Sequence, residues 1–75
     1  MTPEPYAVVI VYSTSHALRA EKVLQEAGIS SKLIPVPRQI SSDCGVCLRI
    51  QRSNAQAVRL LLEAARVEFE GIHNL

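Results

Sequence analysis

The chain has 75 residues, enough for one domain and too few for two. Hydrophobic residues make up 48% of it and charged residues 20%, a globular composition that excludes an intrinsically disordered chain. With a formal net charge of +1, one Phe, two Tyr and no Trp, it lacks the basic surface and stacking rings typical of proteins that bind nucleic acids or anionic membranes. The longest apolar run, residues 7–12, is far shorter than the roughly 20 residues of a membrane span.

Residues 1–5, MTPEP, predict a disordered tail before a single domain at residues 6–75. They do not resemble a signal peptide, so a cytoplasmic protein is expected. The segment YAVVIVYS is rich in β-branched residues and predicts a buried strand. STSHALRAEKVLQEAG then predicts a helix that is capped by a hydroxyl residue at 13–15 and ends at Gly28. Its expected apolar face consists of Ala17, Ala20, Leu24 and Ala27.

Two prolines mark the next extended segment, SKLIPVPR, as an edge strand, because proline cannot donate to a sheet ladder. A loop, QISSD, leads to a third strand, CGVCLRIQ, which begins at Cys44. Side chains alternate between the two faces along a strand. One face is therefore expected to carry Val46, Leu48 and Ile50, and the other Cys47 and Arg49.

A second helix is expected to begin at Ser53, which forms a capping box with Gln56. Its apolar side chains repeat at helical spacing: Val58, Leu61, Leu62 and Ala65. The end of the chain allows two interpretations. Residues 67–70, VEFE, alternate like an exposed edge strand, whereas Phe69 also continues the helical series toward Gly71. We favour the strand.

The element order is βαββαβ, which predicts an α+β, ferredoxin-like two-layer sandwich: one antiparallel sheet with two helices on one face. Its strand order, 4-1-3-2, puts the proline-bearing strand at an edge. The first strand is apolar on both faces, which suggests that the open sheet face meets another chain in a homodimer. A central strand that simply tolerates valine on both faces is the other interpretation, and the sequence does not choose between them.

In this topology the third strand begins beside the point where the first strand ends and the first helix begins. Cys44 is therefore expected near the helix N-terminus, where amide groups and the positive end of the helix dipole favour an anion. Such a setting lowers a thiol pKa from about 8.5 toward values at which thiolate is abundant. Gly45 would leave the backbone beside the sulfur open to another molecule. The candidates for stabilising the thiolate are Gly45, His16, Arg38, Ser42 and Ser15.

The two cysteines allow other interpretations. In a regular strand they point to opposite faces, so Cys47 resolves an adduct on Cys44 only if a bulge at Gly45 brings the sulfurs together. A zinc site needs four ligands, and beyond the cysteines the chain has only His16 and His73. The cysteines of a copper-chaperone site, which shares this fold, lie between the first strand and the first helix, where this chain has STSH. A thioredoxin-like pair lies at the start of a helix in a different fold. Either cysteine, and Cys47 above all, can instead be a small packing residue.

Three segments, YSTSHALRAEKVLQEAGI, LIPVPRQISSDCGVCLRI and VEFEGIHNL, resemble the small selenium/sulfur (Se/S) carrier protein-like family, formerly a domain of unknown function. The most specific part is the succession Pro37-Arg38, Ile40-Ser41 and Cys44-Gly45. The resemblance implies that Cys44 carries sulfur or selenium as a persulfide or its selenium analogue, and it supports a closing strand. Cys47 stands where a small residue or a second cysteine occurs, so no essential role is carried over to it.

The sequence therefore predicts a cytoplasmic carrier. Cys44 would accept sulfur or selenium from a donor such as a cysteine desulfurase and pass it to an acceptor protein by thiol exchange. No Ser-His-Asp set, paired carboxylates or phosphate-binding glycine loop can be assembled, so neither enzymatic turnover nor a metal or cofactor is expected. The alternative is a non-catalytic module that binds a ligand or a partner protein and in which the cysteines are structural.

Overall fold

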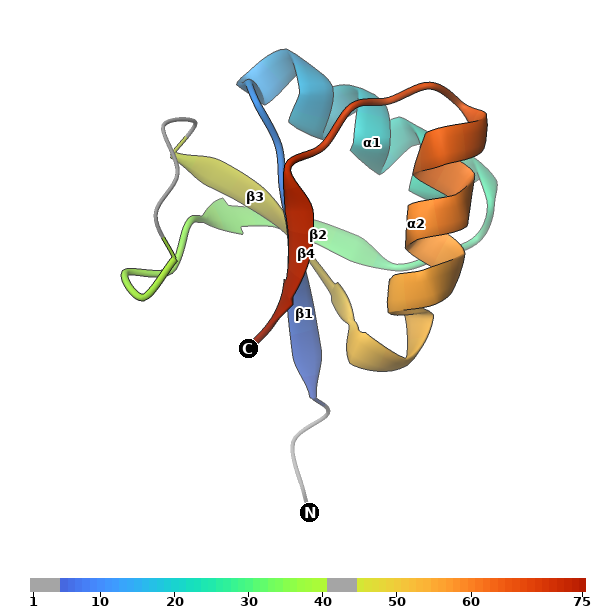
Figure 1. Cartoon of the computed structure of the whole chain (residues 1–75). Coiled ribbons are helices and arrows are strands. Elements are labelled where there is room, and N and C mark those ends of the chain that lie inside the picture. The colour runs from blue at the N-terminus through green and yellow to red at the C-terminus, as the bar shows by residue number, and fades with distance from the viewer. Residues whose placement is uncertain (1–4, 41–44) are drawn as a thin grey trace.

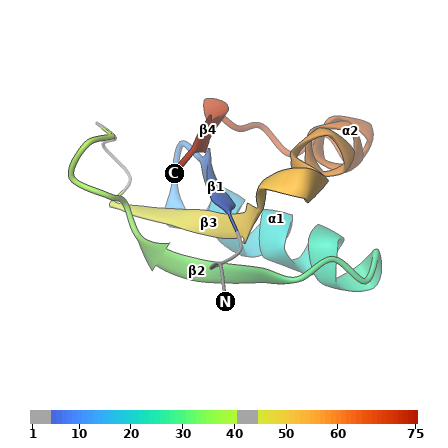
Figure 2. The ribbon, with the colours of Figure 1, turned by 90° about the horizontal axis from the view of Figure 1, so that it is seen from below.

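The computed structural model describes residues 5–40 and 45–75, which form an α+β fold of the ferredoxin-like type (Figure 1). Its elements in chain order are β1 (Tyr6–Ile10), α1 (Thr14–Glu26), β2 (Ser31–Pro35), β3 (Val46–Gln51), a 3-10 turn η1 (Arg52–Asn54), α2 (Ala55–Ala64) and β4 (Gly71–Asn74). The antiparallel sheet has the order β2-β3-β1-β4, and Figure 2 shows β2 and β4 at its two edges. Counted from the other edge, this is the predicted order 4-1-3-2, with the proline-bearing strand at an edge. Of the tail expected at residues 1–5, residues 1–4 lie outside the described residues.

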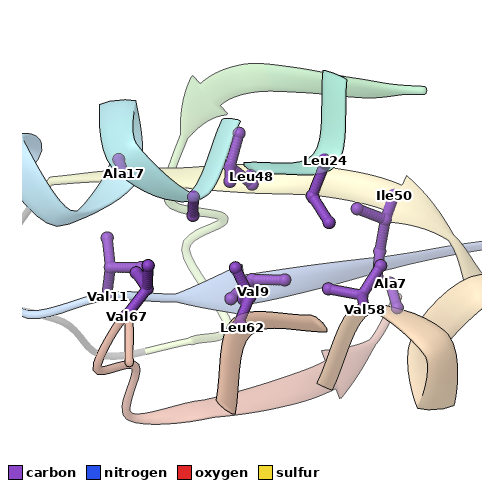
Figure 3. Packing of buried hydrophobic residues seen from close by; sticks show 11 residues of the cluster. Ala7, Val9, Val11, Ala17, Leu24, Leu48, Ile50, Val58, Leu62 and Val67 are labelled. Atoms are coloured by element: carbon purple, nitrogen blue, oxygen red, sulfur yellow. The ribbon is translucent and has the colours of Figure 1, made fainter. Parts of the chain in front are cut away.

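Both helices cover one face of the sheet and share a core with it. Alternate side chains of β1 and β3, among them Val9 and Leu48, point to this face, where they meet Leu24 of α1 and Leu62 of α2 (Figure 3). All four side chains are fully buried. α1 ends as predicted, because Gly28 adopts φ +75°, a left-handed conformation that stops a helix at little cost only in glycine.

β1 is buried on both faces within one chain. Val8 and Ile10 point away from the helices, and they are at most 2% exposed, as is Cys47 of β3. The side chains packed against these three come from β2 and the segment after it: Ile34, Val36 and Ile40. The apolar second face of β1, which led to the expectation of a homodimer, is therefore explained by packing within the chain.

The second helix begins later than predicted. The capping box at Ser53 and Gln56 is wrong, because Ser53 lies in η1 and α2 is preceded by Asn54, whose side chain makes no capping bond. The cause is tertiary. The amide of Arg52 donates to the carbonyl of Pro5 at 3.0 Å, which holds the chain to the sheet until η1 begins. The chain then leaves the sheet through one tight 3-10 turn, and only after it does the α-helix start.

The closing strand exists, but it lies at Gly71–Asn74 and not at residues 67–70. The chain turns after α2 at Arg66, which has φ +58°. Val67 is buried and Phe69 is half-buried, and both pack against the core from the connection that follows. The alternation of residues 67–70 therefore reflects burial of every second side chain, whereas pairing with β1 involves the residues after them.

Candidate functional site

Ser13 caps the N-terminus of α1. Its backbone is extended, with φ −157°, and its Oγ accepts a hydrogen bond from the backbone amide of His16 at 3.3 Å. The same oxygen lies 2.6 Å from Nδ1 of the His16 ring. The tautomer of the imidazole sets the direction of this bond: Nδ1 accepts from the Ser13 hydroxyl when the ring hydrogen is on Nε2, and it donates to Oγ when the hydrogen is on Nδ1. The predicted hydroxyl cap at residues 13–15 is thus confirmed at Ser13, and it also fixes the imidazole against the first turn.

The first turn of α1 contains no acidic residue, so no carboxylate in this turn offsets the partial positive charge of its amides. Next to it, the ring of Tyr12 meets the His16 ring edge-on, with 6.1 Å between their centroids. Tyr12 is 55% exposed, and Ser15 is exposed as well. A partner molecule that approaches this end of α1 therefore meets a phenol, an imidazole and a hydroxyl on a helix end of positive potential.

Gly45 lies at the same end of the sheet. Its carbonyl accepts from the amide of Val36 at 3.1 Å, and Cys47, two residues later, pairs with Ile10 at the end of β1. Gly45 has φ +82°, and a Cβ placed on it would meet no atom within 4 Å. Glycine is therefore required by the left-handed backbone and not by lack of space. The role expected of Gly45, to leave the backbone open to another molecule, stays a prediction.

Arg38 belongs to a turn on the connection between β2 and β3. The amide of Ile40 donates to the carbonyl of Pro37 at 3.0 Å and closes this turn, and the Arg38 side chain is exposed. The predicted carrying residue, Cys44, and Ser42 lie outside the described residues. Of the predicted site, the structure thus brings His16, Ser15 and Gly45 to one end of the sheet, with Arg38 on the connection that leads toward it.

Cys47 is a core residue of the second sheet face. Its side chain is fully buried, and Sγ lies 4.0 Å from the carbonyl oxygen of Pro35. The register is regular from Cys47 to Gln51 against β1 and from Val46 to Ile50 against β2, so no bulge occurs along the described length of β3. This geometry is that of the packing interpretation of Cys47. The bulge expected at Gly45 would also involve Cys44, which lies outside the described residues.

The two histidines lie on different elements and are not arranged as ligands of one metal ion. His73 lies in β4 opposite Val8, whereas His16 lies in α1. Within residues 5–40 and 45–75, no three His, Cys, Asp or Glu side chains are grouped as metal ligands would be. None of the helices in these ranges has the length and apolar character that crossing a membrane requires.

A comparison with protein families adds the decisive observation. The model of the family described as "Putative Se/S carrier protein-like" matches residues 6–74, almost the whole chain. The chain belongs to this family. No curated protein and no solved structure showed a significant match. Membership of the Se/S carrier protein-like family confirms the resemblance drawn from the sequence, and the ferredoxin-like sheet with its closing strand is the fold of this member.

Sequence reasoning missed the contact between the Ser13 hydroxyl and the His16 ring. The signal was present, because the two residues have the spacing of a capping box, with histidine in place of the usual Glu or Gln. It also missed a pocket at the other end of the sheet, where Tyr6, Lys32 and Arg49 meet. That pocket depends on the pairing of three strands, and no local pattern marks it.

Proposed function

We propose that the protein is a cytoplasmic sulfur or selenium carrier, and not an enzyme in its own right, in which the thiolate of Cys44 holds the cargo atom. The observation that carries the proposal is the family match over residues 6–74. Cys44 precedes Gly45 in the sequence, and Gly45 lies at the sheet end where α1 begins without an acidic residue in its first turn. A thiol that is reused between loads needs a reducing compartment, which is why we place the carrier in the cytoplasm.

The loading step is a thiol exchange in which nothing is oxidised or reduced overall. The Cys44 thiolate attacks the terminal sulfur of a persulfide on a donor protein such as a cysteine desulfurase. The new S–S bond forms on Cys44, the S–S bond in the donor breaks, and the donor cysteine leaves as a thiolate. Delivery repeats this step in the same sense, with the thiolate of an acceptor protein attacking the terminal sulfur and Cys44 leaving as the thiolate. A selenium atom in the terminal position follows the same scheme.

Cys47 is not needed in this scheme. The resolving route would have its thiolate attack Sγ of Cys44, form a disulfide and release hydrosulfide, after which a thiol reductant would have to regenerate the pair. The burial of Cys47 and the regular register of β3 favour direct transfer to an acceptor thiol. The same burial also supports, for this one cysteine, the alternative in which the domain is a binding module with structural cysteines.

The test is intact-protein mass spectrometry after incubation with a cysteine desulfurase and cysteine, and then with selenocysteine in its place. The variants are Cys44→Ser and Cys47→Ala; alanine is chosen at position 47 because its site is apolar. We expect an adduct of one sulfur or one selenium atom that dithiothreitol removes, that is lost in Cys44→Ser and that persists in Cys47→Ala. An adduct that survives Cys44→Ser, or none on folded, reduced wild-type protein, would favour the binding module.

A further inference from the structure

A small pocket of about 130 Å³ lies at the end of the sheet opposite the candidate carrier site. Tyr6, which lines it, begins β1, whereas α1 follows the other end of β1 (Figure 1). The remaining lining residues come from β2, β3 and the residue before β2: Ser30, Ser31, Lys32, Arg49, Ile50 and Gln51. This volume suits a molecule or group of a few heavy atoms, because sites for drug-sized ligands are typically about 300–1,000 Å³.

Two of the lining residues, Lys32 and Arg49, are cations. Lys32 and Arg49 are partners in the β2–β3 register, so their side chains leave the same face of the sheet side by side. The acidic side chains of residues 5–40 and 45–75 lie instead on α1, on α2 and in the connection before β4. Like charges directly opposite each other on neighbouring strands oppose pairing. An anion bound between Lys32 and Arg49 would remove this repulsion.

Arg49 is held in place for such a ligand. Its guanidinium carbon lies 4.2 Å from the centre of the Tyr6 ring, so the planar group stacks on the phenol and loses freedom before any ligand arrives. A guanidinium presents its N–H donors in a fork that matches two oxygens of a phosphate group, and an ammonium adds a mobile point charge. Lys32 is exposed and Arg49 is half-buried, so both can reach a ligand from solvent.

We propose that this pocket, between Lys32 and Arg49 beside Tyr6, binds a small tetrahedral oxyanion of the phosphate type. Ser30, Ser31 and Gln51 add polar residues to the lining. The oxygens of a phosphate group point in several directions, whereas the two oxygens of a carboxylate lie in one plane, so a phosphate can accept from the Lys32 ammonium and the Arg49 guanidinium on different sides. The proposal does not depend on Cys44 or on the carrier function.

The test is a titration with inorganic phosphate, followed by backbone amide signals in two-dimensional ¹H–¹⁵N NMR spectra. We expect saturable shifts confined to the residues that line the pocket. Lys32→Gln and Arg49→Gln should each weaken binding at least about tenfold, because each removes charge-assisted hydrogen bonds to the anion. Arg49→Lys, which keeps the charge but loses the fork, should give a smaller loss.

Two matched variants serve as controls. Lys22→Gln removes an exposed lysine of α1, and Arg59→Gln removes an arginine whose guanidinium carbon lies 5.6 Å from the centre of the Phe69 ring. Both should bind phosphate like the wild type. Shifts that do not saturate, that spread over all basic residues, or that persist in Lys32→Gln would overturn the proposal.

Two further ligands define the chemistry of the bound group. Acetate should bind at least about tenfold more weakly than phosphate, and equal binding would contradict a site for tetrahedral oxyanions. Glycerol 3-phosphate separates the two sources of such a group. Tighter binding than inorganic phosphate would identify a small phosphate monoester as the ligand, and equal binding would identify the free anion; either result supports the proposed chemistry.

Discussion

Replacing Cys47 by serine or by alanine tests whether this residue belongs to the core of the second sheet face. Cys47→Ala removes one buried sulfur atom and is expected to cost about 1 kcal/mol of unfolding free energy, since a group of that size buried among apolar neighbours contributes about this much. Serine keeps more volume, but it places a hydroxyl among Val8, Ile10 and Ile34. The sulfur is already 4.0 Å from the Pro35 carbonyl, and the shorter C–O bond would leave the oxygen farther away.

A hydroxyl buried in this way costs about 1–3 kcal/mol, so Cys47→Ser should be less stable than Cys47→Ala by about 1–2 kcal/mol. The whole free energy of unfolding of a domain of this length is roughly 4–11 kcal/mol, so the difference between the two variants is a large part of it. In urea unfolding followed by circular dichroism, with a slope of about 1 kcal/mol per molar urea, the midpoints should differ by about 1–2 M. Equal midpoints, or a more stable serine variant, would refute the placement of Cys47 in an apolar core.

The same burial predicts a slow reaction with alkylating reagents. In a Cys44→Ala background, iodoacetamide should modify Cys47 at least about a hundredfold more slowly in the native protein than in urea, because the sheet face must open first. The readout is intact mass against time at fixed pH. If native and unfolded chains reacted at similar rates, Cys47 would be accessible, and the resolving role would regain support.

Three further changes probe the local backbone, each by urea unfolding. Arg66→Gly should stabilise the protein by about 0.5–1 kcal/mol, because Arg66 has φ +58° and glycine adopts that conformation without strain; a loss would show that the arginine side chain matters more. Gly45→Ala should lower the free energy of unfolding by about 1 kcal/mol, because Gly45 has φ +82°, although its Cβ would have open space. Gly71 has no positive φ, so Gly71→Ala should lower it less. Ser13→Ala should cost about 1 kcal/mol and shift the His16 ring signals in NMR spectra, and an unchanged ring would contradict the contact between the two side chains.

Most of the fold could be predicted from the periodicity of the apolar residues and from the positions of the prolines. The β-branched run of the first strand, the alternation in the third strand and the helical spacing of Ala17, Ala20 and Leu24 are local signals, and the structure bears them out. The order of the elements predicted the strand order, and Pro35 agreed with it because it marked β2 as an edge strand. The start of α2 could not be predicted from a local signal. The 3-10 turn η1 comes before it, at the point where the Arg52 amide bonds to the Pro5 carbonyl, and these two residues are far apart in the sequence.

The closing segment and the second sheet face show a related limit. Residues 67–70 alternate in burial whether or not their backbone pairs with a neighbour, so the pattern alone could not place β4 at Gly71–Asn74. Likewise, the apolar second face of β1 indicated that other side chains bury it, but the sequence did not show which segment provides them. Val36 and Ile40, which follow β2 in the chain, are among these side chains.

The register of β3 also decides how its cysteine spacing should be read. Cys47 lies on the face away from the helices, while Leu48 and Ile50 complete the core beneath them. A slip of one residue would turn Cys47 toward the helices, but it would move Leu48 and Ile50 out of that core and put Arg49 into it. The position of the Cys47 sulfur is therefore held by the burial of the whole strand, and the Cys-x-x-Cys spacing in this chain does not by itself indicate a dithiol site.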